Sequence, residues 1–499
     1  MTPVSMKPAS RSFPGRAVGG LPWPLAGTLA LPMVMALAAC SSAPVYEPPA
    51  MPVPAAFGEA AAWQGANPQS PDVPDDWWRG LGDPVLTGLQ ARVVVDNENL
   101  KASAAQLRAA EAALAASRAS LWPTVGVSTS ATRSRNAATT TAAGGTGVLQ
   151  NTYSLSGSAS WDADLWGRLS GAVDASSARL QASRDDLLAA RLSIQVTLAQ
   201  VYFSLRTAEA QGGALERAVA GYQKSLELTQ NRYAAGVASA ADVAQAQSQL
   251  QSAQAQSLEL RTQRAQLAHA IAVLLGQPPA SFRLAATAAL PVPPEVPALL
   301  PATLLQRRPD IAAAERRVAA ANAQVGVARA AFFPALTLSA SGGYRGNVWA
   351  DLVSLPNRFW SFGPALAFAV FDGGGRSAAT NQALAAVDQA AATYRQTVLT
   401  AFQEVEDNLV AAANLREEAQ IQAAALAAAR RSLEITLNQY RYGTVSYLNV
   451  VTAQATALTA ERTLIDVQNR QLAAVAQLLK NAAGRWDRPV ELESRQANP

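Results

Sequence analysis

The sequence predicts a mainly α-helical protein that also contributes long β-strands to a membrane β-barrel. Three observations in the 499-residue chain predict this class. Two alanine-rich stretches without proline are each long enough for one very long helix, four segments alternate small polar with apolar residues, and most of the pattern occurs twice. Helical period, strand period and internal repetition are separate signals, and here they agree.

The composition excludes most site chemistry. Hydrophobic residues make up 49% of the chain and charged residues 15%. Much of the apolar share is alanine, which favours long, closely packed helices. Cys40 and His269 are the only cysteine and the only histidine, so we expect no metal centre, no disulfide within the chain and no cofactor. A Ser-His-Asp site would depend on His269 alone, within a helical pattern, and we therefore expect no enzyme.

The charge balance argues against nucleic-acid binding. Residues 1–39 carry Lys7, Arg11 and Arg16 and no acid, which leaves 37 bases against 36 acids in the rest of the chain. A near-neutral mature chain lacks the basic surface that nucleic-acid binding requires.

The N-terminal residues have the features of a bacterial lipoprotein signal. A basic region is followed by an apolar region, and together they predict a signal peptide over 1–39. Leu-Ala-Ala-Cys is similar to a lipobox, in which the cysteine, here Cys40, is acylated and holds the chain on the outer-membrane lipid. Ser41 after it resembles an outer-membrane address. A transmembrane anchor is the alternative, but prolines interrupt the apolar region, and we expect 40–76 to be a lipid-anchored, proline-rich segment.

The rest of the chain contains an internal repeat, whose two copies are about 210 residues apart. Leu121-Trp122-Pro123 in the first copy matches Phe332-Phe333-Pro334 in the second. We expect repeat 1 over 77–290, repeat 2 over 291–485 and a C-terminal tail over 486–499. Each copy has the pattern of a helix, two strands, a very long helix, a tight turn and a long helix.

Four segments with a period of two predict strands, at about 124–134, 152–162, 335–345 and 360–371. A half-buried soluble sheet shows the same alternation. Runs of about ten residues are also the length of a tilted strand that crosses a bilayer. The outer-membrane address favours the membrane strand.

Four strands per chain leave two open edges, which lipid does not tolerate. The chain must therefore oligomerise. Two copies would give eight strands and an interior filled by side chains, whereas three would give twelve and room for water. The small residues on one face favour the trimer.

The long helices are predicted over about 167–233 and 376–440. At 1.5 Å per residue each is about 100 Å long, and their apolar spacing is typical of a coiled-coil-like wall. Gly212-Gly213 predicts a kink or a break in the first helix. A coiled-coil spacer without a lumen is the alternative, and it leaves the strands unexplained.

Several short motifs, in their order and spacing, resemble the outer-membrane factor family, the TolC-like channels, and in particular its NodT/OprM-type lipoproteins. The motifs are Trp77-Trp78, Asp83-Pro84, Asn97-Glu98-Asn99-Leu100, Arg308-Pro309-Asp310-Ile311, Phe371-Asp372-Gly373-Gly374 and Ala401-Phe402-Gln403-Glu404-Val405.

The resemblance implies a homotrimer with a twelve-stranded barrel in the outer membrane and a helical tunnel in the periplasm. It implies that small molecules arrive from an inner-membrane RND-type pump through a periplasmic membrane-fusion adaptor, in a tripartite efflux system. A TolC-like duct for protein secretion and a non-conducting structural envelope lipoprotein are the alternatives.

The resemblance also implies roles for the two hairpin tips, 234–239 and 442–446, which contact the adaptor in the family. Glycine followed by small residues allows a tight turn between long helices. The candidate adaptor-contact residues are Gly236, Val237, Ser239, Gly443, Thr444 and Ser446.

A closed periplasmic aperture is implied just past the tips. Asp242 matches an aspartate that accepts a hydrogen bond from a tyrosine matching Tyr440, and Leu448 matches a hydrophobic constriction. Asn449 and Thr452 stand where relatives often have aspartates, so we do not expect a strongly anionic ring.

A tip arginine found in some relatives is replaced here by Val445. Arg441 is the candidate for that role.

Overall fold

The computed structural model describes residues 44–59, 76–135, 149–287, 290–294 and 308–482. These residues form two compact units, one that contains the β-sheet and one that contains most of the helical residues. The predictions for the signal peptide, for Cys40 and for the tail at 486–499 lie outside the described residues.

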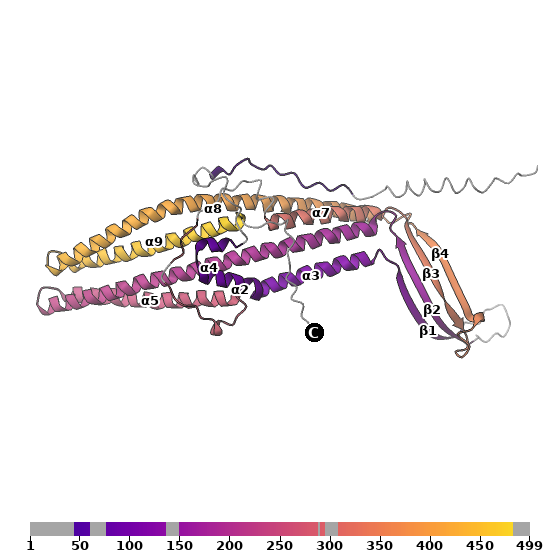
Figure 1. Cartoon of the computed structure of the whole chain (residues 1–499), viewed down its shortest axis with the longest axis horizontal. Coiled ribbons are helices and arrows are strands. Elements are labelled where there is room, and N and C mark those ends of the chain that lie inside the picture. Colours follow the sequence, from indigo (N-terminus) through magenta and orange to yellow (C-terminus); the bar gives the residue numbers. More distant parts are fainter. Residues whose placement is uncertain (1–43, 60–75, 136–148, 288–289, 295–307, 483–499) are drawn as a thin grey trace, which may run out of the picture. The chain divides into compact units, whose positions relative to one another are not determined.

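All four predicted strands are present in one antiparallel sheet, in the order β1-β2-β3-β4 (Figure 1). The strands are β1 (Thr124–Arg135), β2 (Leu149–Ala163), β3 (Ala335–Gly346) and β4 (Arg358–Ala367). β2 of the first repeat pairs directly with β3 of the second.

One boundary prediction is wrong, because β4 ends at Ala367 and not at residue 371. Its partner β3 begins at Ala335, which pairs with Ala367. Pro334 precedes β3 and has no N–H group, so the hydrogen-bond ladder has no donor there to continue.

The register aligns like side chains across the sheet. On one face, Gly126, Ser158, Ser341 and Ser361 form a single row. Serine hydroxyls on this face also bond across strands, with Oγ–Oγ distances of 2.7 Å for Ser130–Ser154, 3.0 Å for Ser128–Ser156 and 2.8 Å for Ser341–Ser361. We call this the serine face.

The opposite face of the sheet is apolar and exposed. Val125, Val127, Trp360, Phe362 and Leu366 are each at least 67% exposed. Exposure of so many large apolar side chains on one face indicates a partner surface or lipid.

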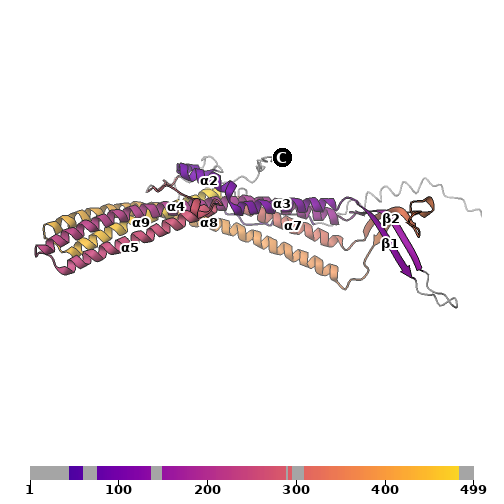
Figure 2. The ribbon, with the colours of Figure 1, turned by 90° about the horizontal axis from the view of Figure 1, so that it is seen from below.

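The long helices match their predicted spans to within about one residue. α4 (Arg168–Ala234) and α8 (Gly375–Arg441) have 67 residues each. They are followed by α5 (Ala240–Leu274) and α9 (Tyr447–Ala482). α4 with α5 forms one antiparallel hairpin and α8 with α9 forms the other, and the hairpins lie side by side (Figures 1 and 2).

Of the kink or break expected at Gly212-Gly213, the break is wrong, because α4 continues through both glycines. Ala210, Ala214 and Leu215 around them are buried. Packing of these side chains outweighs the cost of about 1 kcal/mol that a glycine imposes on a helix.

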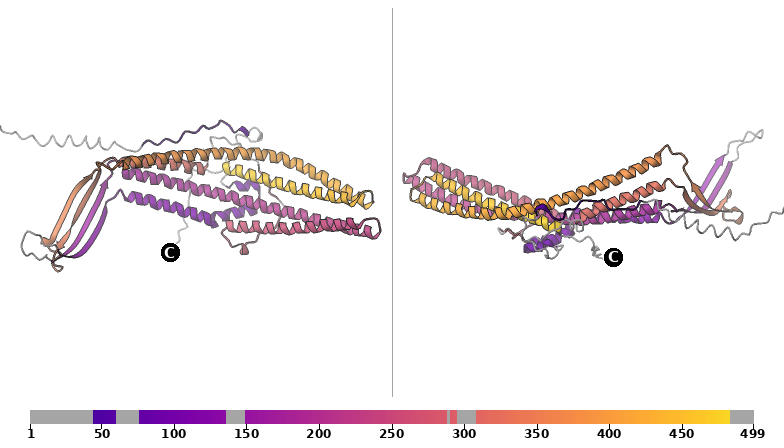
Figure 3. Two further views of the ribbon diagram at one scale, coloured as in Figure 1. Left: turned by 180° about the vertical axis from the view of Figure 1, so that it is seen from behind. Right: turned by 90° about the horizontal axis from the view of Figure 1, so that it is seen from above.

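The shorter elements repeat in the same way. α3 (Glu98–Ala119) and α7 (Pro309–Ala330) have 22 residues each and precede β1 and β3. The first repeat also contains α2 (Pro84–Asp96) and the short 3-10 helix η2 (Trp77–Leu81). Two other 3-10 turns are η3 (Pro279–Ser281) and η4 (Leu355–Asn357). Figure 3 shows the helices from two further sides.

The largest hydrophobic core joins both hairpins to α2 and η2. Tyr202 and Phe203 of α4 are fully buried there beside Trp77 and Trp78. None of the described helices is both long and apolar enough to cross a bilayer.

The described part of the proline-rich segment, residues 44–59, packs on the helical unit. Tyr46 Oη donates a 2.6 Å hydrogen bond to Glu315 Oε1, and the Phe57 ring meets the Phe402 ring edge-on at 6.2 Å. These contacts place the segment against α7 and α8.

Candidate functional site at the hairpin tips

Both predicted tip turns are present, and they have the same geometry. Gly236 and Gly443 have φ angles of 76° and 79°, in the left-handed region that favours glycine. Val237 N donates to Arg232 O at 2.9 Å, and Thr444 N donates to Gln439 O at 3.0 Å. This backbone bond across six residues closes the turn that follows each long helix, whose last residue lies two positions before the glycine.

A capping box fixes the start of α5 in the first hairpin. Asp242 N donates to Ser239 Oγ at 3.1 Å, and Ser239 N donates to Asp242 Oδ2 at 3.0 Å. The two orphan N–H groups of the helix end are thereby satisfied. In the second hairpin the matching residues are Ser446 and Asn449, and Asn449 N donates to the Ser446 carbonyl at 3.2 Å.

Tyr440 is buried and bonded to α4, but not through Asp242. Its side chain is 3% exposed, and its hydroxyl lies 3.1 Å from Thr229 Oγ1. The Asp242 carboxylate accepts from Ser239 instead. Within this chain the two groups that the family resemblance pairs therefore have different partners.

Arg232, which the sequence did not single out, joins the ends of the two long helices. Its guanidinium lies 4.8 Å above the Tyr440 ring, and its Nη1 donates to the Tyr440 carbonyl at 3.0 Å. The carbonyls in the last turn of a helix lack intrahelical partners and carry partial negative charge, which a cation stabilises. Arg232 of α4 thus caps the C-terminal end of α8.

Arg441, the arginine expected to act at the tip, bonds within its own helix. Its Nη1 donates to Asn438 Oδ1 at 3.1 Å. Among the arginines described at the tips, Arg232 is therefore the one that bonds across the hairpins, at a position where the second repeat has Gln439.

Tyr447 adds a buried phenol that sequence reasoning also missed. It is 2% exposed, its ring centroid lies 5.6 Å from that of Tyr440, and its hydroxyl has no hydrogen-bond partner among the described residues. Burial raises the pKa of Tyr447 to about 12, with smaller contributions from Tyr440, Tyr222 and Asp242. The phenol therefore stays neutral at physiological pH.

The remaining aperture candidates share one exposed face of α9. Leu448 is 63% exposed, and Asn449 and Thr452 are exposed beside it. Thr452 lies four residues after Leu448 and three after Asn449, spacings that place it next to both on the surface of the helix. Tyr447 and Val450 face the opposite way and are buried.

The motifs that carry the family resemblance lie away from the tips and hold helix ends in place. Arg308 is 5% exposed, and its Nη1 donates to Glu404 at 2.8 Å and to Asn481 at 3.0 Å. Arg308 also donates hydrogen bonds to both carboxylate oxygens of Asp310. Burial alone would raise the pKa of Asp310, but the hydrogen bonds and charge of Arg308 hold it below its usual value.

Two other motif aspartates cap helices. Asp83 accepts from Val85 N at the start of α2 and from the Tyr202 hydroxyl at 2.5 Å. Asp372 accepts from the backbone of Gly374 and Arg376, and those bonds with the Arg376 side chain lower its pKa to about 2. These contacts give Asp83 and Asp372 structural roles at helix ends.

The chain matches the family described as outer membrane efflux protein, over residues 91–277 and 300–484. It is 32% identical to outer membrane protein OprJ of Pseudomonas aeruginosa over 475 residues, which covers 93% of this chain and 97% of that protein. It is 30% identical to the toluene efflux pump outer membrane protein TtgC of Pseudomonas putida over 464 residues, covering 93% and 96%.

Solved structures show the same likeness. The outer-membrane channel OprN is 28% identical, with a TM-score of 0.83 over 89% of this chain and 99% of that one. CusC is 26% identical, with a TM-score of 0.80 over 89% and 100%. With its four-stranded sheet, its paired long helices and these matches, the chain belongs to the outer membrane efflux protein family and is an outer-membrane channel of the TolC-like fold.

Proposed function

We propose that three copies of this chain form a closed channel, through which small molecules leave the cell in a tripartite efflux system. The observation that carries the proposal is the sheet. In the described chain, β1 and β4 each have one paired and one unpaired edge, and the apolar face is exposed. Unpaired backbone groups in hydrocarbon cost several kcal/mol each, so the edges must pair with other copies.

The serine face supports an open, water-filled lumen. Three chains of four strands give twelve strands, and a barrel larger than about eight strands leaves an interior that side chains do not fill. Serine and glycine are small, and serine hydroxyls bond to water as well as to each other. The apolar face, with Trp360 and Phe362, then meets lipid.

The hairpin tips are the proposed docking points for a periplasmic membrane-fusion adaptor. Both turns are largely exposed, and in each a glycine is followed by short side chains; the shared turn geometry presents two similar tips per chain. The proposed contact residues are Gly236, Val237, Ser239, Gly443, Thr444 and Ser446.

We assign closure of the aperture to the contacts between the tips of the two hairpins, which Arg232, Thr229 and Tyr440 form and which we call the seam. Arg232 and Thr229 of α4 hold Tyr440 of α8, while Leu448, Asn449 and Thr452 line the tunnel from the exposed face of α9. Separating the hairpins breaks the Arg232 contacts. Asp242 acts by fixing the first turn of α5 and not by bonding Tyr440 within its chain.

The names of relatives support small solutes as cargo. They include an antibiotic efflux pump protein, a toluene efflux pump protein and a pyoverdine export protein. We propose that an inner-membrane RND-type pump supplies the energy and that the channel itself performs no catalysis. No observation here favours the protein-secretion duct or the non-conducting tether.

We retain the lipid anchor at Cys40 and the repeats over 77–290 and 291–485 as part of the proposal. The duplicated order of helix, two strands and two long helices supports the repeats. The lipobox-like sequence before Cys40 supports the anchor.

Cysteine labelling in intact membranes tests which face lines the pore. Ser156 and Ser158 lie on the serine face, and Leu155, the residue before Ser156, lies on the opposite face. Ser156→Cys and Ser158→Cys should react with a small charged maleimide, whereas Leu155→Cys should not, because lipid covers it. Equal labelling of all three would place the sheet in water and refute the pore.

A further inference from the structure

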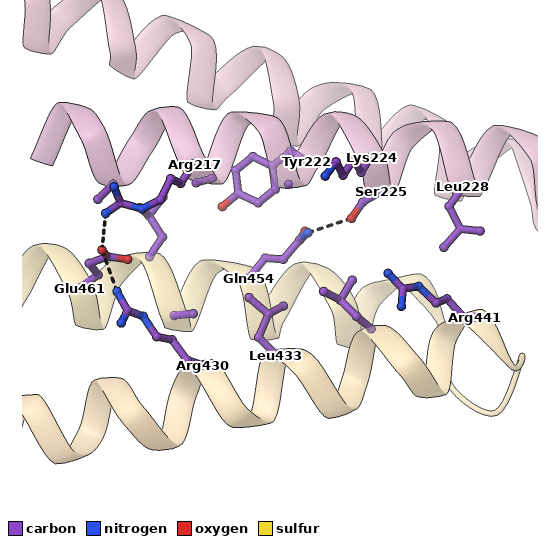
Figure 4. Close-up of a pocket in the computed structure, with 16 residues that line it drawn as sticks. Arg217, Tyr222, Lys224, Ser225, Leu228, Arg430, Leu433, Arg441, Gln454 and Glu461 are labelled. Atoms are coloured by element: carbon purple, nitrogen blue, oxygen red, sulfur yellow. Dashed lines mark hydrogen bonds and ion pairs between the residues drawn. The ribbon is translucent and has the colours of Figure 1, made fainter.

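A cavity of about 280 Å³ lies between the two hairpins. α4 forms one wall, and α8 with α9 forms the other (Figure 4). This volume is at the lower end of known ligand sites, so it fits a small molecule and not a two-chain lipid.

Two buried polar side chains on opposite walls of this cavity each have one atom without a hydrogen-bond partner among the described residues. Tyr222 of α4 is 2% exposed, and its hydroxyl has no partner among the described residues. Gln454 of α9 is 5% exposed; its Nε2 donates to Ser225 Oγ at 2.9 Å, but its Oε1 has no partner there. Buried polar groups are nearly always bonded, so two such groups on residues that line one cavity point to an occupant.

The charged lining of the cavity favours an anion. Four cations line it, and Glu461 is the only carboxylate among the lining residues; the cations are Arg217, Lys224, Arg430 and Arg441. Arg217 and Arg430 bind Glu461 at 2.7 and 2.9 Å. Burial would raise the pKa of Glu461, but these two arginines lower it overall. Glu461 is therefore ionised, and a positive excess remains.

The rest of the lining is apolar. Leucine side chains from all three helices face the space, together with alanines of α4 and α9. The leucines are Leu228, Leu433, Leu437 and Leu458. A ligand that fits both kinds of wall has a charged head and a hydrocarbon body.

We propose that this cavity binds a small amphiphilic organic anion, with a carboxylate or phosphate head and a short alkyl or aromatic body. The Tyr222 hydroxyl donates to the head, the cations balance its charge, and the leucines cover the body. Because α4 lines one side and α8 with α9 the other, the bound anion joins the two hairpins.

Photo-crosslinking of the assembled full-length protein tests the site directly. The probe is octanoate with a diazirine in its chain, and mass spectrometry maps the labelled peptides. Label should appear within 214–228, 430–441 and 454–461, the three stretches that line the cavity. It should fall at least five-fold in Tyr222→Phe and in Arg430→Gln. Arg431→Gln is the matched control, because Arg431 is the exposed neighbour on α8 and does not line the cavity; its label should not change.

An octylamine probe with the same diazirine chain distinguishes recognition of the anionic head from non-specific hydrophobic binding. Equal labelling by amine and carboxylate, label confined to other peptides, or no decrease in the cavity variants would overturn the proposal. If Tyr222→Phe does not assemble, Lys224→Gln, an exposed lining residue, provides the same comparison. The readout does not depend on conduction, so failure of the proposed channel function leaves the result interpretable.

Discussion

Replacing Arg232 by glutamine removes the contact that joins the tips of the two hairpins. The change deletes the 3.0 Å bond to the Tyr440 carbonyl and the cation above its ring. A hydrogen bond from a charged donor contributes about 1.5–3 kcal/mol, a cation–π contact about 0.5–2 and a cation at a helix C-terminus about 0.3–1. These contributions overlap, and Arg232 is half-buried, so we expect a loss of about 2 kcal/mol per chain.

A loss of about 2 kcal/mol shifts the balance between open and closed tips roughly thirty-fold for each seam. Purified Arg232→Gln channels in planar bilayers should therefore open more often and conduct more than wild type. Arg431→Gln is the matched control, because it removes the same charge from an exposed position on α8 that does not line the cavity between the hairpins. Wild-type conductance in Arg232→Gln, or an equal rise in Arg431→Gln, would refute the reasoning.

Three further changes test other parts of the structure. Burial, and to a smaller extent the nearby Asp186 carboxylate, raises the pKa of Asp185 from 3.8 to about 6. The ionised form of Asp185 therefore destabilises the fold. The stability that this group contributes grows as the pH falls from about 7 to 4. Asp185→Asn should raise the free energy of unfolding at pH 7 by about 1–3 kcal/mol, seen as a higher thermal midpoint, and the gain should vanish near pH 4. Gly343→Ala places a Cβ 2.1 Å from the Leu155 carbonyl oxygen and should reduce heat-resistant oligomer on gels, whereas Gly363→Ala, with open space around it, should not. Tyr440→Phe removes one buried hydrogen bond, about 1 kcal/mol, and should raise conductance less than Arg232→Gln; the reverse order would contradict the seam assignment.

The strands and long helices could be predicted because their signals are local. Alternation of serine with apolar residues sets the two faces of β2 without reference to any other segment. The 67-residue helices likewise follow from continuous helical spacing without proline. The end of β4 could not be predicted this way, because it depends on where its partner β3 begins.

The seam between the tips could not be predicted from either hairpin alone. Arg232 and Tyr440 are 208 residues apart in sequence, and nothing near Arg232 shows that its partner is the end of another helix. The repeat conceals this asymmetry. Tyr233 and Tyr440 match in the alignment of the two copies, yet Tyr233 is 51% exposed and Tyr440 is 3% exposed. Comparison of the copies suggests equal roles, whereas packing gives them different ones.

The family resemblance placed the chain correctly, and the bond it implies between Asp242 and Tyr440 is not made within one chain. Ser239 is three residues before Asp242, and a serine followed at that spacing by a carboxylate is the sequence signal of a capping box. That signal was available and indicates a structural role for Asp242. The contact of Arg232 with the end of α8, by contrast, is visible only in the folded structure.

Native mass spectrometry of the detergent-solubilised protein tests the central claim most directly, because it counts the chains that close the sheet. Our account predicts a complex of three chains, with no folded species of lower mass that retains β-structure by circular dichroism. A stable, folded single chain in the same preparation would contradict it, since four strands with two unpaired edges would then have to persist without partners.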